Sequence, residues 1–368
     1  MGNTQPRNPG LDVIRCTALI CVVAVHFFLN TEFYKLPVTG RGMMAMTVMR
    51  SSLMVCVPLF LMLTGYLVRS RDTSARYYIK LVRILFVYAA ASFLCAGYKV
   101  FFRNADLNLT GAVAGIFDFT TAPYSWYIEM YIGLFLLTPF LNVLYDGLET
   151  KTRKQTLILT FLILTAGPSV FNAFPLDSPG WWLEPRKYTD HMLLVPDWWK
   201  QLYPITYFFL GRYLREYPLT WKPGKHLALT GTVFLLCGVY NVYRSWGGTF
   251  LKGPWQDYGS ILIITQTVLV FSLLARFRYD KMPAAVAKLI SKISELSLGA
   301  YLCSWVFDQM IYPRLNATGL SMTEKWLWSP VIVAAILTGS LVAAWMIDGV
   351  YCVTVKPLVD RYLSKTAR

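Results

Sequence analysis

The chain has 368 residues, of which 55% are hydrophobic and 15% are charged, and its formal net charge is +15. This composition lies outside the usual range of soluble globular proteins and indicates an integral membrane protein. The seven cysteines are scattered through apolar runs without a CxxC pair, so neither a disulfide framework nor a metal site is predicted. We attribute the basic excess to membrane-flanking loops rather than to nucleic-acid binding.

Runs of about 20 mostly apolar residues predict transmembrane helices. In chain order they cover residues 12–31, 51–69, 82–102, 124–145, 155–174, 201–214, 226–245, 256–275, 293–313 and 327–350. We therefore expect an all-α bundle of about ten transmembrane helices that forms a single multipass domain over residues 1–368.

The distribution of Lys and Arg predicts that both termini face the cytoplasm. With the N-terminus inside, the inner segments hold roughly twice as many of these residues as the outer segments. The opposite orientation would invert this bias. A bacterial plasma membrane is the expected location.

The first span, "LDVIRCTALICVVAVHF", contains Asp12, Arg15 and His26. Arg15 and His26 are separated by three helical turns plus about 20°, so they share one face and lie about 16 Å apart along the axis. Asp12 precedes Arg15 by one turn. Ionisable groups are costly in hydrocarbon, so this face is predicted to line the bundle interior or a wet cavity.

Two roles remain open for His26. It could be a core histidine that is hydrogen-bonded between helices. It could also act as a general base, since imidazole titrates near neutral pH. Glu129, in a later span, is a candidate buried carboxylate beside the ring, with an interfacial position on the outer turn as its alternative; Asp308 is a weaker candidate.

A cluster of cations precedes the third span. Arg76, Lys80 and Arg83 follow an i, i+4, i+7 spacing, which places them on one helical face at the cytoplasmic entrance to the membrane. Such a face suits the phosphates of a nucleotide-bearing donor. Its alternative is contact with anionic lipid headgroups.

Several strings resemble those of the acyltransferase family 3 membrane proteins, in the same order. They are "LDVIRCTALICVVAVHF", "VPLFLMLTGYLV", "KLVR", "SWYIEMYIGLFLLTPFL", "YFFLGRYL", "ISELSLGAYL" and "VKPL". Three positions depart from the family pattern. Thr64 stands where Ser is commoner, Lys80 replaces the first arginine of a paired motif, and Ser304 stands where a histidine is frequent.

The resemblance implies an O-acetyltransferase that uses acetyl-CoA from the cytoplasm and a hydroxyl of a cell-envelope glycan or lipid-linked sugar. On this interpretation Arg76, Lys80 and Arg83 hold the donor phosphates, with a looser grip at Lys80 because an ammonium lacks the planar fork of a guanidinium. His26 serves as the base or as a transient acyl carrier. Arg15 either orients the donor or only pairs with Asp12.

The long outer segment, residues 175–201, is rich in aromatic and acidic side chains. It suits either a sugar-binding platform or an interfacial aromatic belt, and we favour the belt. Two other functions compete with acyl transfer. A proton-coupled transporter or flippase would also use buried ionisable groups, although no inverted halves are visible. A catalytically inactive sensor or scaffold is the third alternative.

Overall fold

The computed structural model describes residues 8–173, 180–184, 192–277 and 279–365. Within these residues the secondary structure consists of α-helices and short 3₁₀ helices, with no strand and only two isolated β-bridges. The all-α prediction is therefore confirmed for the part of the chain that is described. The helices form two compact units, each built from several separate stretches of the chain.

Unit 1 comprises Met1–Val68, Leu148–Ser291 and Gly319–Ser329. Its elements are α1 (Pro9–Asn30), η1 (Phe33–Lys35), α2 (Gly40–Leu53), α3 (Cys56–Leu67), α8 (Lys151–Thr165), α9 (Gly167–Phe171), α10 (Gly180–Leu183), η2 (Lys200–Leu202), α11 (Tyr203–Glu216), α12 (Pro223–Ser245), η3 (Pro254–Gln256), α13 (Ile261–Arg276) and α15 (Met322–Leu327). Helix α1 packs against α2, α3 and α13.

Unit 2 comprises Arg69–Gly147, Lys292–Thr318 and Pro330–Arg368. Its elements are α4 (Ala75–Tyr78), α5 (Leu81–Arg103), α6 (Leu109–Phe117), α7 (Trp126–Gly147), most of α14 (Ala284–Asn316), nearly all of α16 (Ser329–Thr354) and α17 (Lys356–Lys365). Helix α5 packs against α6 and α7.

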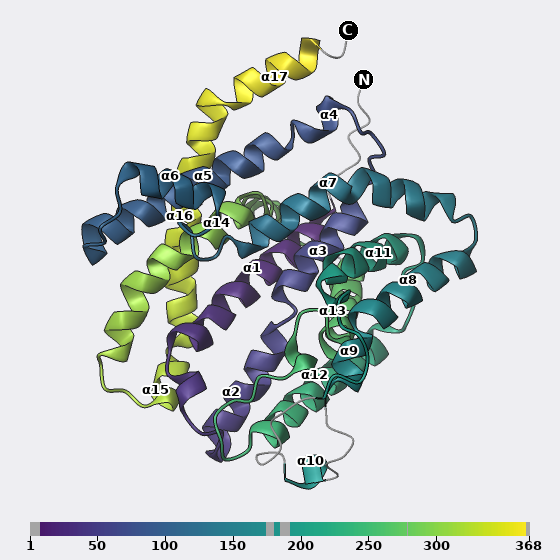
Figure 1. Cartoon of the computed structure of the whole chain (residues 1–368), viewed down its shortest axis with the longest axis vertical. Coiled ribbons are helices and arrows are strands. Elements are labelled where there is room, and N and C mark those ends of the chain that lie inside the picture. The colour runs from purple at the N-terminus through teal and green to yellow at the C-terminus, as the bar shows by residue number, and fades with distance from the viewer. Residues whose placement is uncertain (1–7, 174–179, 185–191, 278, 366–368) are drawn as a thin grey trace. The chain divides into compact units, whose positions relative to one another are not determined.

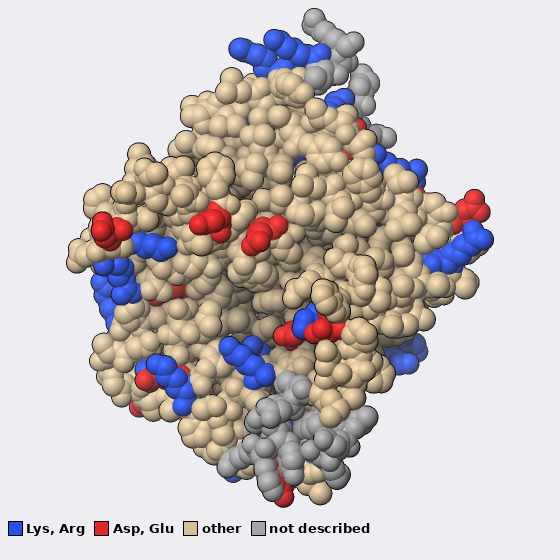
Figure 2. Space-filling model, in the orientation of Figure 1, with Lys and Arg blue, Asp and Glu red and all other residues tan. Residues whose placement is uncertain are grey.

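Among the described residues, seven helices are long and apolar enough to cross a membrane. They are Pro9–Asn30, Gly40–Leu67, Ala75–Arg103, Trp126–Gly147, Pro223–Ser245, Pro254–Arg276 and Ser329–Thr354. On the face drawn in Figure 2, most atoms belong to residues other than Lys, Arg, Asp and Glu. These features are those of a multipass membrane protein.

Three of the ten predicted spans are not confirmed, although each coincides with a helix. Helices α8 and α11 have 15 and 14 residues, which is short for a bilayer of about 30 Å. Helix α14 is long, with 33 residues, but it is less apolar than the seven spans. The cytoplasmic location of both termini stays a prediction.

The second span is longer than the sequence predicted. It starts at Gly40 rather than near residue 51, because α2 and α3 together form a span of 28 residues. The short break between them falls at Met54 and Val55. Pro58 lies in the first turn of α3 and lacks the N–H that would bond to the Met54 carbonyl, which accounts for the interruption.

The tightest helix crossing of unit 1 joins α3 to α11 (Figure 1). It depends on two glycines. A Cβ atom at Gly65 would lie 1.9 Å from the Phe208 carbonyl oxygen, and one at Gly211 would lie 2.1 Å from the Met62 carbonyl oxygen. Small residues let membrane helices approach until their backbones touch. The crossing therefore explains why glycine is needed in both "LTGYL" and "FLGRY".

Candidate active site

The predicted polar stripe of α1, formed by Asp12, Arg15 and His26, lies in unit 1. Asn8 caps the helix, because its side-chain oxygen accepts a hydrogen bond from the Gly10 amide at 2.9 Å. Asp12 is in the first turn, where a carboxylate is stabilised by the helix dipole. Asp12 and His26 are both buried, whereas Arg15 is half-buried.

Arg15 and Asp12 form an ion pair, with 3.8 Å between Nη1 and Oδ1. The Asp12 side chain is 7% exposed and that of Arg15 is 27% exposed, so the arginine keeps access to the surroundings of the helix. Asp12 and Arg15 are therefore paired, and the guanidinium is only partly buried.

His26 is four residues from the end of α1, or about 6 Å along the helix axis. Its residue exposure is 8%. Asn30 donates a hydrogen bond to the His26 carbonyl at 2.9 Å, which ties the last turn together. The ring therefore sits inside unit 1, close to the end of the span rather than at its centre.

The carboxylates of unit 2 differ from the sequence prediction. Glu129 is exposed on the first turn of α7, so its expected burial is wrong. Its place in the first turn explains this, because the helix dipole stabilises a carboxylate there without a buried partner. Its interfacial position stays a prediction. Asp308 on α14 is fully buried and accepts a hydrogen bond from the Tyr124 hydroxyl at 2.7 Å.

Ser304 precedes Asp308 by one turn of α14 and is also fully buried. Its hydroxyl donates to the Tyr301 carbonyl at 2.7 Å within the same helix. Such a bond is the usual way in which a buried serine in a membrane helix satisfies its donor. The side chain thus has a structural role that needs no catalytic partner.

The three predicted donor-binding cations, Arg76, Lys80 and Arg83, also lie in unit 2, and all are exposed. Arg76 belongs to the single turn α4, and Lys80 is the residue directly before α5. Hydrogen bonds from Ser74 lower the pKa of the neighbouring Asp72 below its ordinary value, with smaller contributions from Lys80 and Arg76. A carboxylate therefore lies within electrostatic reach of these cations.

Arg83 has an acidic partner. Its Nη2 lies 2.8 Å from Asp348 Oδ1 on α16, and Lys292 Nζ lies 3.5 Å from the other oxygen of the same carboxylate. The Arg83 side chain is 47% exposed, whereas that of Asp348 is 15% exposed. Because Lys292 also pairs with Asp348, Arg83 can turn to a ligand phosphate without leaving this carboxylate unpaired.

Arg50 on α2 is a buried cation that the sequence analysis missed. Its Nε donates to the Tyr34 hydroxyl at 2.9 Å and its Nη1 donates to Gln256 Oε1 at 3.0 Å. The guanidinium also lies 4.7 Å from the centroid of the Phe250 ring. Arg50 thereby joins the segment after α1 to the segment before α13.

The signal for Arg50 was present in the sequence, since it is a cation in the apolar run "MAMTVMRSSLMVCVP". It was overlooked because the predicted span began at residue 51, which placed the arginine at a helix start. The true start at Gly40 puts it ten residues inside α2.

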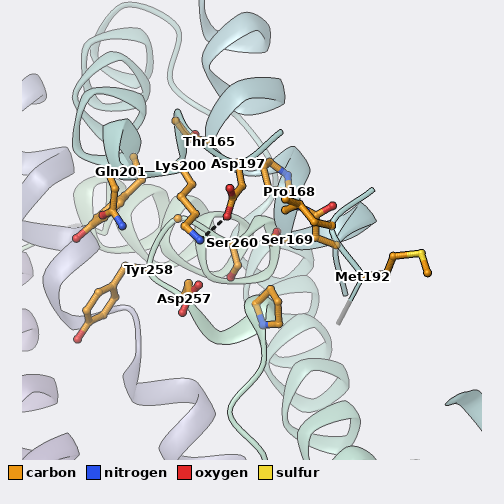
Figure 3. Close-up of a pocket in the computed structure, with 15 residues that line it drawn as sticks. Thr165, Pro168, Ser169, Met192, Asp197, Lys200, Gln201, Asp257, Tyr258 and Ser260 are labelled. Atoms are coloured by element: carbon orange, nitrogen blue, oxygen red, sulfur yellow. Dashed lines mark hydrogen bonds and ion pairs between the residues drawn. The ribbon is translucent and has the colours of Figure 1, made fainter. Parts of the chain in front are cut away.

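A cavity of about 510 Å³ opens in unit 1 (Figure 3). It is formed by three segments that are far apart in the sequence. They are residues 165–172 at the end of α8 and in α9, residues 192–203 around η2, and residues 254–260 from η3 to the start of α13. His26 is not among the residues that line this cavity.

Part of the outer aromatic segment can be placed. Trp198 and Trp199 are 90% and 55% exposed, beside the cavity-lining Asp197. Tyr188, Asp190 and His191 lie outside the described residues. Exposed rings of this kind agree with the favoured interfacial belt and equally with a sugar platform.

Two comparisons with known proteins found nothing, since no curated protein and no solved structure matches the chain. The third found a match over most of its length. The model of the acyltransferase domain of acyltransferase family 3 matches residues 8–345, from the start of α1 into α16. This span includes the helical stripe of Asp12, Arg15 and His26, the cations of α4 and α5, and the α3–α11 crossing. The chain therefore belongs to acyltransferase family 3.

Proposed function

We propose that the protein transfers a short acyl group, acetyl in the first instance, from cytoplasmic acyl-CoA to a hydroxyl of a cell-envelope glycan or lipid-linked sugar. The observation that carries the proposal is the family match along residues 8–345, within which a spanning helix holds a buried histidine near one end. A membrane acyltransferase with its base inside a spanning helix accounts for these two features better than a carrier does.

The reaction needs little beyond positioning and proton transfer. The acceptor oxygen attacks the thioester carbonyl while its proton passes to the imidazole of His26. The tetrahedral intermediate then expels the CoA thiolate, which takes the proton back from the imidazolium as the C–S bond breaks. In the alternative order, the imidazole first attacks the thioester and displaces CoA as its thiol. The acceptor hydroxyl then attacks the acyl-imidazole, and the imidazole leaves with the hydroxyl proton.

The proposed donor site uses the exposed cations of unit 2. Arg76 and Lys80 are exposed, and Arg83 can turn to a phosphate because Lys292 remains paired with Asp348. Cations clustered along a short segment can bind a nucleotide diphosphate through charge-assisted hydrogen bonds. The half-buried Arg15 is proposed to orient the donor in addition to its pairing with Asp12.

The test is transfer of label from radiolabelled acetyl-CoA to a glycan acceptor by the purified protein in detergent or nanodiscs. His26→Ala is expected to lower the rate by about 10²- to 10⁴-fold, the usual contribution of a general base. His226→Gln is the matched control, because that histidine is buried on α12 and its Nε2 lies 3.0 Å from the Leu269 carbonyl oxygen. It should retain most of the activity if it folds.

Two outcomes would contradict acyl transfer. Movement of a glycan or lipid across a vesicle membrane without covalent change would favour the carrier. A His26→Ala variant that fully restores an envelope phenotype would favour a scaffold. A single-turnover reaction without acceptor separates the two chemical orders, since an acyl-imidazole would appear as an acetylated protein mass that His26→Ala abolishes.

A further inference from the structure

We infer that the cavity between α9, η2 and the start of α13 is the acceptor site, and that it takes an uncharged sugar. The inference rests on the proposed function only in naming the bound sugar as the acceptor. Sugar binding itself is a separate property of unit 1 and is measured separately below.

The cavity has the size expected of a small-molecule site. Its volume of about 510 Å³ falls within the range of ligand pockets, roughly 300–1,000 Å³. That space accommodates one or two sugar rings. Side-chain hydrogen bonds from Ser169 and Asn172 fix its walls.

Two serines fix the wall at the start of α13. Ser260 caps the helix, with its hydroxyl accepting a bond from the Ile263 amide at 3.3 Å. The Ser169 hydroxyl of α9 accepts a bond from the Ile261 amide at 3.1 Å. The Ser169 bond joins α9 to α13, and the Ser260 cap fixes the first turn of α13, so one side of the cavity is formed before any ligand arrives.

The opposite wall is held by Asn172. Its Oδ1 accepts bonds from the Leu194 and Val195 amides at 2.8 and 2.9 Å, and its Nδ2 donates to the Val195 carbonyl at 2.9 Å. One side chain thus fixes the backbone that leads to η2. A preformed cavity loses little entropy when it binds a ligand.

The lining favours a hydroxyl-rich ligand. Asp197, Lys200 and Asp257 line the same space in Figure 3, with Lys200 Nζ 2.5 Å from Asp197 Oδ2. Carboxylates accept two hydroxyl donors each, and an ammonium donates to ring or hydroxyl oxygens. Tyr203 and Tyr258 also line the cavity, and aromatic side chains suit the C–H face of a sugar.

The same lining disfavours the acyl donor. Lys200 is the only Lys or Arg among the described residues of the cavity wall, and it shares that wall with two carboxylates. A nucleotide with several phosphates would meet more like charge than opposite charge. The donor cations Arg76, Lys80 and Arg83 do not line this cavity.

The cavity lies at the same end of unit 1 as His26, which is close to the C-terminal end of α1. The segment after α1 reaches the loop between α12 and η3, where Val38 donates to the Gly248 carbonyl at 2.7 Å and Gly247 donates to the Val38 carbonyl at 2.9 Å. Arg50 bonds to both sides of this junction, at Tyr34 and Gln256. The loop then continues into the cavity wall at Pro254.

The binding test uses saturation-transfer NMR with methyl α-glucopyranoside and methyl N-acetyl-β-glucosaminide on the full-length protein in nanodiscs. Asp257→Ala and Lys200→Ala are expected to weaken binding of the better probe at least about tenfold, the value of one lost charge-assisted hydrogen bond. Glu149→Gln is the matched control, since Glu149 is exposed in unit 1 and does not line the cavity. It should bind as the wild type does.

The kinetic test separates the acceptor from the donor. Asp257→Ala should raise the KM for the acceptor at least about tenfold and leave the KM for acetyl-CoA and the acetylation of the enzyme without acceptor unchanged. Unchanged sugar binding and acceptor KM in both cavity variants would overturn the inference. If the variants lose sugar binding but the wild type transfers no acyl group, the cavity is a sugar site and the proposed function fails instead.

Discussion

Two regions of the molecule differ in whether their cations are buried or exposed. Around α2, α3 and α11 in unit 1, Arg50 and Arg212 are buried at 7% and 2% exposure. At the start of α5 in unit 2, Arg76, Lys80 and Arg83 are exposed. A buried charge needs partners that are built into the fold, whereas an exposed charge can exchange its partners for a ligand. The α2 and α11 arginines thus serve the packing of unit 1, whereas the cations at the start of α5 stay available to a ligand.

The largest effect is expected at the close crossing of α3 and α11. Gly65→Ala places a Cβ against the Phe208 carbonyl, a backbone atom that cannot turn away, so we expect a loss of about 3 kcal/mol or more in the free energy of unfolding. Thermal unfolding and monodispersity in detergent measure it. Gly231→Ala on α12 is the control, because no atom lies within 4 Å of its Cβ. Equal behaviour of both variants would show that the crossing is looser than described.

The next effect is expected for the buried cation itself. Arg50→Met removes two charge-assisted hydrogen bonds and leaves Tyr34 and Gln256 without their donor, which we expect to cost about 3 kcal/mol. Arg50→Lys should recover only part of this, since an ammonium lacks the forked geometry. Arg41→Met, an exposed arginine on the same helix, should change stability by less than about 0.5 kcal/mol. Similar losses at both positions would remove the contrast between buried and exposed cations.

A smaller effect, on binding rather than folding, is expected in unit 2. Arg76→Ala and Lys80→Ala should each raise the KM for acetyl-CoA by about three- to tenfold without shifting the unfolding midpoint. The KM should also rise with salt, because exposed charges are screened. Arg361→Ala on α17 provides an exposed basic control in the same unit. A change in stability with no change in KM would mean that these cations are structural too.

The smallest effect is expected for the ion pair of α1. Asp12→Asn should change the free energy of unfolding by less than about 1 kcal/mol, because the partner guanidinium is partly exposed at a distance of 3.8 Å. Arg15→Ala should raise the KM for acetyl-CoA if that residue orients the donor. Equal kinetic effects of both variants would instead assign Arg15 to pairing alone.

Local patterns predicted a large part of the fold. Seven of the expected spans are helices of sufficient length and apolarity, since a run of about 20 apolar residues has few other stable arrangements in lipid. The ion pair of Asp12 and Arg15 followed from their i, i+3 spacing. The start of α2 was misplaced because Gly40 to Arg50 is less apolar than the residues that follow, and Glu129 was misjudged because periodicity does not tell how deep a helix end lies.

Neighbours along the chain were enough to specify the helical membrane class, the family and the single stripe on α1, because each of these depends on residues within one helix or one short string. Long-range packing, in contrast, selected which charges are buried and where a cavity opens. Arg50 gains its partners from η1 and η3, and the cavity is built from three segments that lie up to about 95 residues apart. Such contacts arise when distant elements pack together, and no local pattern of residues specifies them.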